Sequence, residues 1–344
     1  MRRRPPLDLP RRYWPLGRTR NAPAPASRPD TAGERLFDEE MLARLRRLVL
    51  HSGRARAEGI AGEHRSRRRG ASPEFADFKS YSQGDDFRRI DWNTYARLDG
   101  LFVRLSEVTT ELGVHVLLDT SNSMDWRADP VTPTKLIYAQ RLAGAIGYVA
   151  LWHFDRLTIV PFGADSGHPY GPVQGRANIV PMLRYLERLQ PLGQTEINAT
   201  IERYARIRKR AGMLLLISDL LSNDQESLRD GLRLLRSRGW HVIVMHVLDP
   251  AEVTPALAAR AFAAASPGSQ GESAVELLEV ESGERLRLAA TESVLARYSD
   301  AFSTWLTETE AACHDEEAVY VRLQTDWPFD DVVMGLLHRR GVVA

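Results

Sequence analysis

Residues 115–124 read HVLLDTSNSM, and the apolar run in this stretch ends abruptly in a carboxylate and two hydroxyls. A short apolar run bounded by turn-forming residues is typical of a buried strand. Asp119 then stands at the carboxyl end of the strand, and Ser121 and Ser123 follow in the loop. The sequence therefore predicts a core strand that leads into an oxygen-rich loop.

Outward from this strand, apolar runs and amphipathic segments alternate between residues 114 and 250. Near-continuous apolar strands separated by helices indicate a mostly parallel sheet covered on both faces. Strands are expected at 114–118, 157–162, 213–217 and 241–247, and helices at 134–153, 179–189, 197–208 and 225–237. We therefore predict an α/β domain over residues 111–250, with a doubly wound sheet of the Rossmann type.

The segments before this domain differ from it in composition. Residues 1–32 are rich in Arg and Pro and are expected to form a disordered tail. Residues 33–110 are expected to hold an amphipathic helix from about Asp38 and a small β element. In that element, Asp99-Gly100 predicts a hairpin turn between extended runs at 93–97 and 101–108.

The segment after it, residues 251–344, is expected to complete the α/β domain. A second hairpin is expected there, with strands at 275–280 and 285–288, followed by a helix at 292–312, a strand at 319–323 and a helix at 330–339.

Composition excludes several classes of function. The net charge of +1 gives the 344-residue chain no preference for nucleic acid or membrane, and the Arg65–Arg69 cluster has no interleaved aromatic residues for base stacking. Cys313 is the only cysteine, which excludes an internal disulfide and fits a reducing compartment, so we expect a cytoplasmic protein. The most apolar run, 142–152, is too short for a membrane span.

Asp119, Ser121 and Ser123 together form an all-oxygen donor set, which suits Mg²⁺, or else Mn²⁺ or Ca²⁺, better than zinc. Two more oxygen donors are expected close by: Thr195 in the loop before a helix, and Asp219 at the end of the strand expected beside that of Asp119. The alternative is that the Ser and Asp side chains only cap a helix N-terminus.

These five residues resemble the metal-ion-dependent adhesion site of the von Willebrand factor A fold. The resemblance implies that Ser121, Ser123 and Thr195 coordinate the ion directly or nearly so, while Asp119 and Asp219 act largely through bound water. It also implies an open coordination position that a carboxylate from a partner protein fills.

Four further stretches resemble the bacterial domain-of-unknown-function 58 (DUF58) family over roughly residues 60–340. They are SPEFADF (72–78), GDDFRRIDW (84–92), ARLDGLFVR (96–104) and TDWPF (325–329). The signature residues, which form either an internal ion-pair network or a partner surface, are Glu74, Asp77, Gly84, Asp85, Asp86, Arg88, Arg89, Asp91 and Trp92.

The resemblance also carries expectations about context. Members of that family carry a von Willebrand A-like domain after the signature, and the family tends to accompany MoxR-type AAA+ ATPases, which makes such an ATPase the implied partner. Many relatives begin with membrane helices, whereas this sequence begins with an Arg/Pro tail, so a soluble form without a transmembrane segment is expected.

The functional hypothesis is a non-catalytic, metal-dependent protein-interaction module. One alternative is a Mg²⁺-dependent phosphoryl-transfer hydrolase with Asp119 as nucleophile. Phosphatases of the haloacid dehalogenase type place a second Asp two residues later as acid/base, and Ser121 stands there in this chain. The other alternative is a scaffold that does not use a metal.

Overall fold

The computed structural model describes residues 36–51, 65–66, 75–81, 90, 92, 94–95, 100–106, 108–109, 112–163, 168–194, 197–207, 210–221, 225–254, 274–278, 285–289 and 292–344. The chain divides into two compact units. One comprises residues 51–112, and the other comprises residues 1–50 together with 113–344.

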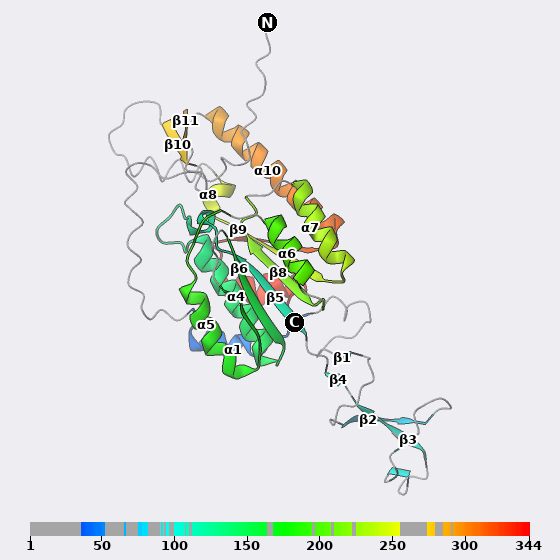
Figure 1. Ribbon diagram of the computed structural model, residues 1–344. Coiled ribbons are helices and arrows are strands. Elements are labelled where there is room, and N and C mark those ends of the chain that lie inside the picture. Colours follow the sequence, from blue (N-terminus) through cyan, green and yellow to red (C-terminus); the bar gives the residue numbers. More distant parts are fainter. Residues whose placement is uncertain are drawn as a thin grey trace. The chain divides into compact units, whose positions relative to one another are not determined.

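The larger unit is built on a six-stranded sheet with the strand order β12-β9-β8-β5-β6-β7 (Figure 1). The strands are β5 (Gly113–Asp119), β6 (Arg156–Phe162), β7 (Tyr170–Gln174), β8 (Met213–Ser218), β9 (His241–Leu248) and β12 (Val319–Gln324). Neighbouring strands are parallel except for β6 and β7, which are antiparallel. The predicted α/β fold with a doubly wound, mostly parallel sheet is therefore confirmed.

Helices cover both faces of this sheet (Figure 1). The helices are α4 (Lys135–Trp152) and α5 (Ile179–Arg188) on one face, and α6 (Ile197–Ile207), α7 (Gln225–Ser237) and α10 (Glu292–Asp315) on the other. Short elements join them: η3 (Asn122–Asp125), η4 (Arg176–Asn178) and α8 (Pro250–Val253).

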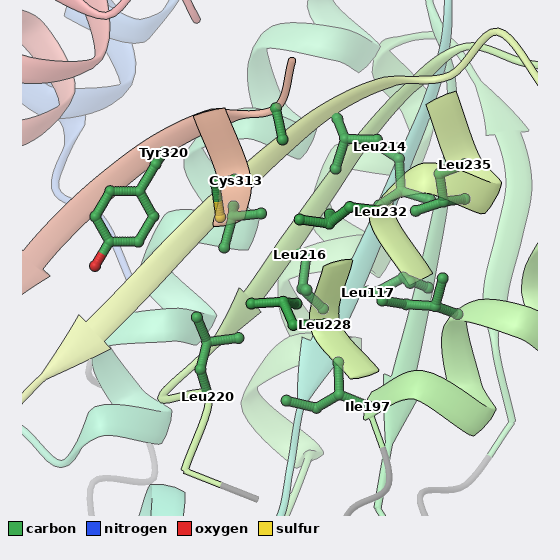
Figure 2. Close-up of a cluster of buried hydrophobic side chains, with 14 of the residues drawn as sticks. Leu117, Ile197, Leu214, Leu216, Leu220, Leu228, Leu232, Leu235, Cys313 and Tyr320 are labelled. Carbon is green, nitrogen blue, oxygen red and sulfur yellow. The ribbon is translucent and has the colours of Figure 1, made fainter. Parts of the chain in front are cut away.

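The core beneath α6, α7 and α10 follows from the two-residue period of the strands. Leu117, Leu214 and Leu216 lie on this face and are buried against leucines of α7 and against Ile197 of α6 (Figure 2). Cys313 of α10, the free cysteine, is buried in the same cluster. Because both faces of β5 and β8 are covered, these strands are mostly apolar instead of alternating with polar residues, and the exceptions are His115 and the strand-end residues Asp119 and Ser218.

The amphipathic helix near Asp38 lies in this unit and not with the signature segment. Helix α1 (Glu39–Leu45) begins at Asp38, whose side chain accepts a hydrogen bond from the Met41 amide at 2.7 Å. Its apolar stripe needs a partner surface, and α1 packs on α4 with Met41 and Leu45 buried. Domain organisation therefore differs from the expected 33–110 grouping at this helix.

Two further elements of the larger unit differ from the sequence expectation. The edge strand β7 contains Gly171 and Pro172, which argue against a strand in sequence, although proline is tolerated at a sheet edge. The C-terminal segment is helical as expected, but it contains a π-helical turn: α11 (Phe329–Asp331), η5 (Val332–Leu336) and α12 (Leu337–Arg339). The expected 275–288 hairpin is present as β10 (Ala274–Leu278) and β11 (Arg285–Ala289).

The smaller unit contains two short antiparallel pairs. Strand β1 (Arg65–Ser66) pairs with β4 (Val108–Thr109), and β2 (Phe75–Ser80) pairs with β3 (Phe102–Ser106). The expected hairpin around Asp99-Gly100 is wrong, because Thr94 and Tyr95 are helical and the partner of β3 is β2. Pairing with a strand distant in sequence overrides the local turn signal here.

Several predictions fall on residues outside the described part of the chain. These are the disordered tail at 1–32 and the signature residues Glu74, Gly84, Asp85, Asp86, Arg88, Arg89 and Asp91. Asp77 lies in β2, and the side chain of Trp92 is exposed. None of the described helices combines the length and the apolar character that a membrane crossing requires.

Candidate functional site

The carboxyl ends of β5 and β8 meet where the strand order of the sheet reverses. From β5 the chain adds β6 on one side and later returns to add β8 on the other, and Leu118 pairs with Ile217. Ligands of doubly wound sheets bind beyond the strand ends at such a point. Asp119 at the end of β5 and Asp219 directly after β8 are thereby brought together, and both are buried.

The loop after β5 folds its hydroxyls toward one another. The Ser121 amide donates to Asp119 Oδ1 at 2.9 Å, and the Oγ atoms of Ser121 and Ser123 are 3.0 Å apart. Ser121 stands at the N-terminus of η3 but makes no side-chain cap there, and α4 is capped by Thr134. The helix-cap alternative therefore does not account for these two serine side chains.

A residue that the sequence analysis did not select, Ser218, joins the two strand ends. Its hydroxyl donates to Asp119 Oδ2 at 2.6 Å and accepts from the Leu220 amide at 3.0 Å. Leu220 has φ of 56°, in the left-handed region that a side chain with a Cβ disfavours. The strained turn that carries Asp219 is thus held by the Ser218 hydroxyl at the end of β8, which is itself hydrogen-bonded to Asp119 at the end of the neighbouring strand.

Thr195, another of the predicted oxygen donors, lies outside the described residues. The described part of its loop is bonded to the loop after β5. Leu192 N donates to Thr120 O at 2.7 Å, and Gly193 and Asn122 exchange two hydrogen bonds of 2.9 and 3.1 Å. The loop that carries Thr195 therefore runs beside the serines up to Gln194.

Two further buried charges that were not predicted contact the site. Lys135, the first residue of α4, places its Nζ 2.7 Å from Asp219 Oδ2 and 2.6 Å from Glu252 Oε1. All three side chains are no more than 1% exposed. Glu252 also accepts from the Asp249 amide at 2.8 Å in a capping box at the start of α8. A buried network of charges thus links the strand ends with α4 and α8.

Comparison with known proteins identifies the family. The family model described as "Protein of unknown function DUF58" matches residues 77–298, more than half of the chain. The chain belongs to the DUF58 family.

Two similar proteins are uncharacterized proteins of Mycobacterium tuberculosis and Mycobacterium bovis. Each is 28% identical to this chain over 236 residues, which is 67% of this chain and 73% of the relative. Their descriptions name no activity.

Two carboxylates at this site of the DUF58 protein have strongly raised pKa values. Burial, together with the charge of Asp219, raises the pKa of Asp119 to about 7, and burial raises the pKa of Glu252 to about 7. Burial by itself would lower the pKa of Lys135, but the charges of Asp219 and Glu252 outweigh it, so the pKa is raised. Lys135 is therefore a permanent cation at the strand ends.

His246 of β9 fixes the backbone at Asp219. Its Nε2 lies 2.9 Å from the Asp219 carbonyl and its Nδ1 lies 2.7 Å from the Tyr320 hydroxyl. A carbonyl only accepts, so Nε2 carries the proton and Nδ1 accepts from Tyr320. Burial lowers the pKa of His246 to about 3, which keeps the ring neutral at physiological pH.

The donor set fits a hard divalent cation by type and spacing. Among the described residues, no group of three or more His, Cys, Asp or Glu side chains is arranged to hold a metal, so a site here must use hydroxyls. In an octahedral Mg²⁺ site with bonds of 2.0–2.1 Å, adjacent ligands are about 2.9 Å apart. The Ser121 and Ser123 oxygens, 3.0 Å apart, match that spacing.

One sequence signal could have identified Lys135. A lysine in the first turn of a helix opposes the positive end of the helix dipole, and α4 is otherwise apolar in this region. Such a charge requires a carboxylate partner, and Asp219 was already a candidate. Glu252 has no comparable signal, because its role depends on the position of α8 beside α4, which only the folded chain establishes.

Proposed function

We propose that this DUF58 protein is a non-catalytic, metal-dependent protein-interaction module. Asp119, Ser121, Ser123, Thr195 and Asp219 would hold Mg²⁺, and a carboxylate of another protein would complete its coordination. The observation that carries the proposal is the meeting of two buried strand-end aspartates with two serine hydroxyls 3.0 Å apart at the switch point of the sheet.

The charge of the site supports capture of a carboxylate. Serine hydroxyls donate electron density to an ion without neutralising it, so Mg²⁺ held by few direct carboxylates keeps a strong attraction for an incoming anion. Lys135 further reduces the negative charge of Asp219. An Asp or Glu side chain of a partner supplies the missing negative oxygen.

The hydroxyls themselves lack the environment of a nucleophile. A catalytic serine needs an adjacent base, commonly a histidine. In the described part of the chain, the Ser121 and Ser123 hydroxyls bond one another and neither bonds a histidine. This favours binding over acyl transfer through either serine.

The proposed partner is a MoxR-type AAA+ ATPase, and the proposed setting is the assembly or maturation of a protein complex in the cytoplasm. This part of the proposal is supported by the family resemblance. The partner would present an acidic residue to the site, directly or on a substrate that the ATPase handles.

The metal is tested by titrating the full chain with Mg²⁺ and following the melting temperature. A ligand in hundredfold excess over its dissociation constant stabilises a fold by about 2.7 kcal/mol. We expect a rise in melting temperature that Asp119→Asn abolishes. The control is Asp155→Asn, an equally buried aspartate that precedes β6 at the opposite end of the sheet and should leave the rise intact. An equal rise in Asp119→Asn would contradict the proposed site.

Partner capture is tested with the immobilised full chain and a purified MoxR-type ATPase. Retention should require Mg²⁺, should be lost with a chelator, and should be lost in Asp119→Asn. Retention that survives the chelator would instead support the scaffold that does not use a metal. Absence of retention under every condition would exclude this ATPase as a direct partner.

A further inference from the structure

Lys135 occupies an unusual position for a lysine. Its side chain is fully buried, and its ammonium lies between two carboxylates, 2.7 Å from Asp219 and 2.6 Å from Glu252. A buried charge is tolerated only when it is paired, and here one cation is paired with two anions. When both carboxylates are ionised, the three side chains together carry a net negative charge of one.

One carboxylate oxygen of Asp219 is thus already bound to a cation of the protein itself. Its Oδ2 binds Lys135, and its Oδ1 accepts a long hydrogen bond of 3.3 Å from the Leu221 amide. A divalent ion near Asp219 would meet both the attraction of the carboxylate and the repulsion of an ammonium a few ångströms away. In a buried site this repulsion is weakly screened.

Glu252 weakens that repulsion, because its carboxylate also binds the Lys135 ammonium. Its second oxygen is engaged by the Asp249 amide at 2.8 Å, so the carboxylate is fixed in place by the start of α8. Glu252 shares the ammonium with Asp219 and keeps Lys135 from neutralising Asp219 completely. The negative charge of Glu252 on α8 therefore affects the strand-end site by pairing with Lys135.

We propose that Lys135 is an internal counter-cation that competes with a divalent metal for Asp219, and that Glu252 sets the strength of this competition. The inference rests on the proposed metal site and adds a regulator of its affinity. A consequence is that the site holds its ion weakly by itself and gains from the negative charge that a partner carboxylate brings.

The test compares the dissociation constant of Mn²⁺ by isothermal calorimetry in four full-length proteins at the same pH. Lys135→Met removes the competing charge at similar length, and we expect binding at least about tenfold tighter. Glu252→Gln keeps an oxygen for the Asp249 amide but leaves Lys135 entirely to Asp219, and we expect binding at least about tenfold weaker. The double variant restores the net charge of the wild-type trio and should bind within a few-fold of the wild type.

The opposite signs separate an electrostatic role from a structural one. Loss of packing would weaken binding in both single variants, so weaker binding in folded Lys135→Met would overturn the inference. If Lys135→Met does not fold, unchanged affinity in Glu252→Gln would still overturn the inference. If the wild type binds Mn²⁺ and all variants bind equally, only this inference fails.

Two outcomes bear on the proposed function as well. If the wild type does not bind Mn²⁺ but Lys135→Met does, the lysine replaces the metal in the native protein, which supports the inference and overturns the proposed function. If neither protein binds, both are overturned.

Discussion

At the scale of single residues, the candidate site depends on a strained backbone that is held by packing. Leu220 follows Asp219 directly, has φ of 56°, and buries its side chain in the core beneath α7 (Figure 2). The apolar side chain anchors the turn in the core, and the Ser218 hydroxyl bonds the Leu220 amide. Strain of this kind persists where the surrounding structure determines the conformation, and it is common at functional sites.

Substitution of Leu220 should reverse the usual order of alanine and glycine. Leu220→Ala loses the buried side chain and keeps the strain, whereas Leu220→Gly loses the side chain and relieves the strain. We expect Leu220→Gly to be more stable than Leu220→Ala by about 1 kcal/mol, with both below the wild type by about 2–5 kcal/mol. Urea denaturation measures the free energies of unfolding.

The matched control for this comparison is Leu216, which is equally buried but lies within β8. At Leu216, glycine has no backbone strain to relieve and carries the ordinary entropic penalty. Leu216→Gly should therefore be less stable than Leu216→Ala by about 0.5–1 kcal/mol. The same order at both positions would show that the turn at Leu220 is not strained.

At the scale of elements, His246 connects three strands at the site. It lies on β9, accepts from Tyr320 of β12 and donates to the carbonyl of Asp219, which follows β8. Strand β9 thereby positions the backbone of Asp219, which follows the neighbouring strand β8. The ring is neutral and buried, and protonation of Nδ1 would remove the acceptor of the Tyr320 hydroxyl and place a charge in the core.

Acid should therefore weaken the fold through His246. Its pKa is about 3 in the folded protein and 6.5 when unperturbed, so the unfolded chain binds the proton more readily. The stability from this group is complete above pH 6.5 and is lost as the pH falls toward 3. Between pH 7.5 and 5.5 the wild type should lose about 1.4 kcal/mol relative to His246→Gln.

The comparison with His246→Gln is needed because other buried groups titrate in the opposite sense. Asp119 and Glu252 have raised pKa values, so the folded chain binds their protons more readily and their contribution falls as the pH rises through the range from about 4 to 7. These contributions are common to both proteins and cancel in the difference. A constant difference between pH 7.5 and 5.5 would refute the assignment of a neutral, buried ring.

At the scale of the whole molecule, the signature segment interrupts the larger unit instead of preceding it. Residues 36–50 pack in the α/β unit, where the Val49 and Ala344 backbones exchange hydrogen bonds of 2.8 and 3.0 Å. Leu45, Leu48 and Leu50 are buried. The chain then forms the smaller unit and returns to the larger unit at β5, the first strand of the sheet.

Excision of the smaller unit should leave the larger unit folded. In a variant where a Gly/Ser linker joins residue 51 to residue 112, we expect a single cooperative unfolding transition by circular dichroism. Residues 113–344 alone should be much less stable, because they lose α1 and the backbone hydrogen bonds between Val49 and Ala344, at about 2 kcal/mol for each exposed core side chain. Equal stability of the two variants would contradict the role of residues 36–50.

The sequence by itself determined the order of elements and the strand-end residues of the site. Apolar period depends on neighbours along the chain, so β5, β8, α7 and the strand-end positions of the two aspartates could be predicted. That the aspartates lie together was expected from the general rule that the carboxyl ends of parallel strands meet at one edge of the sheet. The edge strand β7, the partner of β3 and the place of α1 could not be predicted, because each depends on pairing between distant segments. Only the tertiary structure revealed the roles of Ser218, Lys135 and Glu252. A buried polar side chain needs a hydrogen-bond or ion-pair partner, and for these residues the partner lies on another element of the fold.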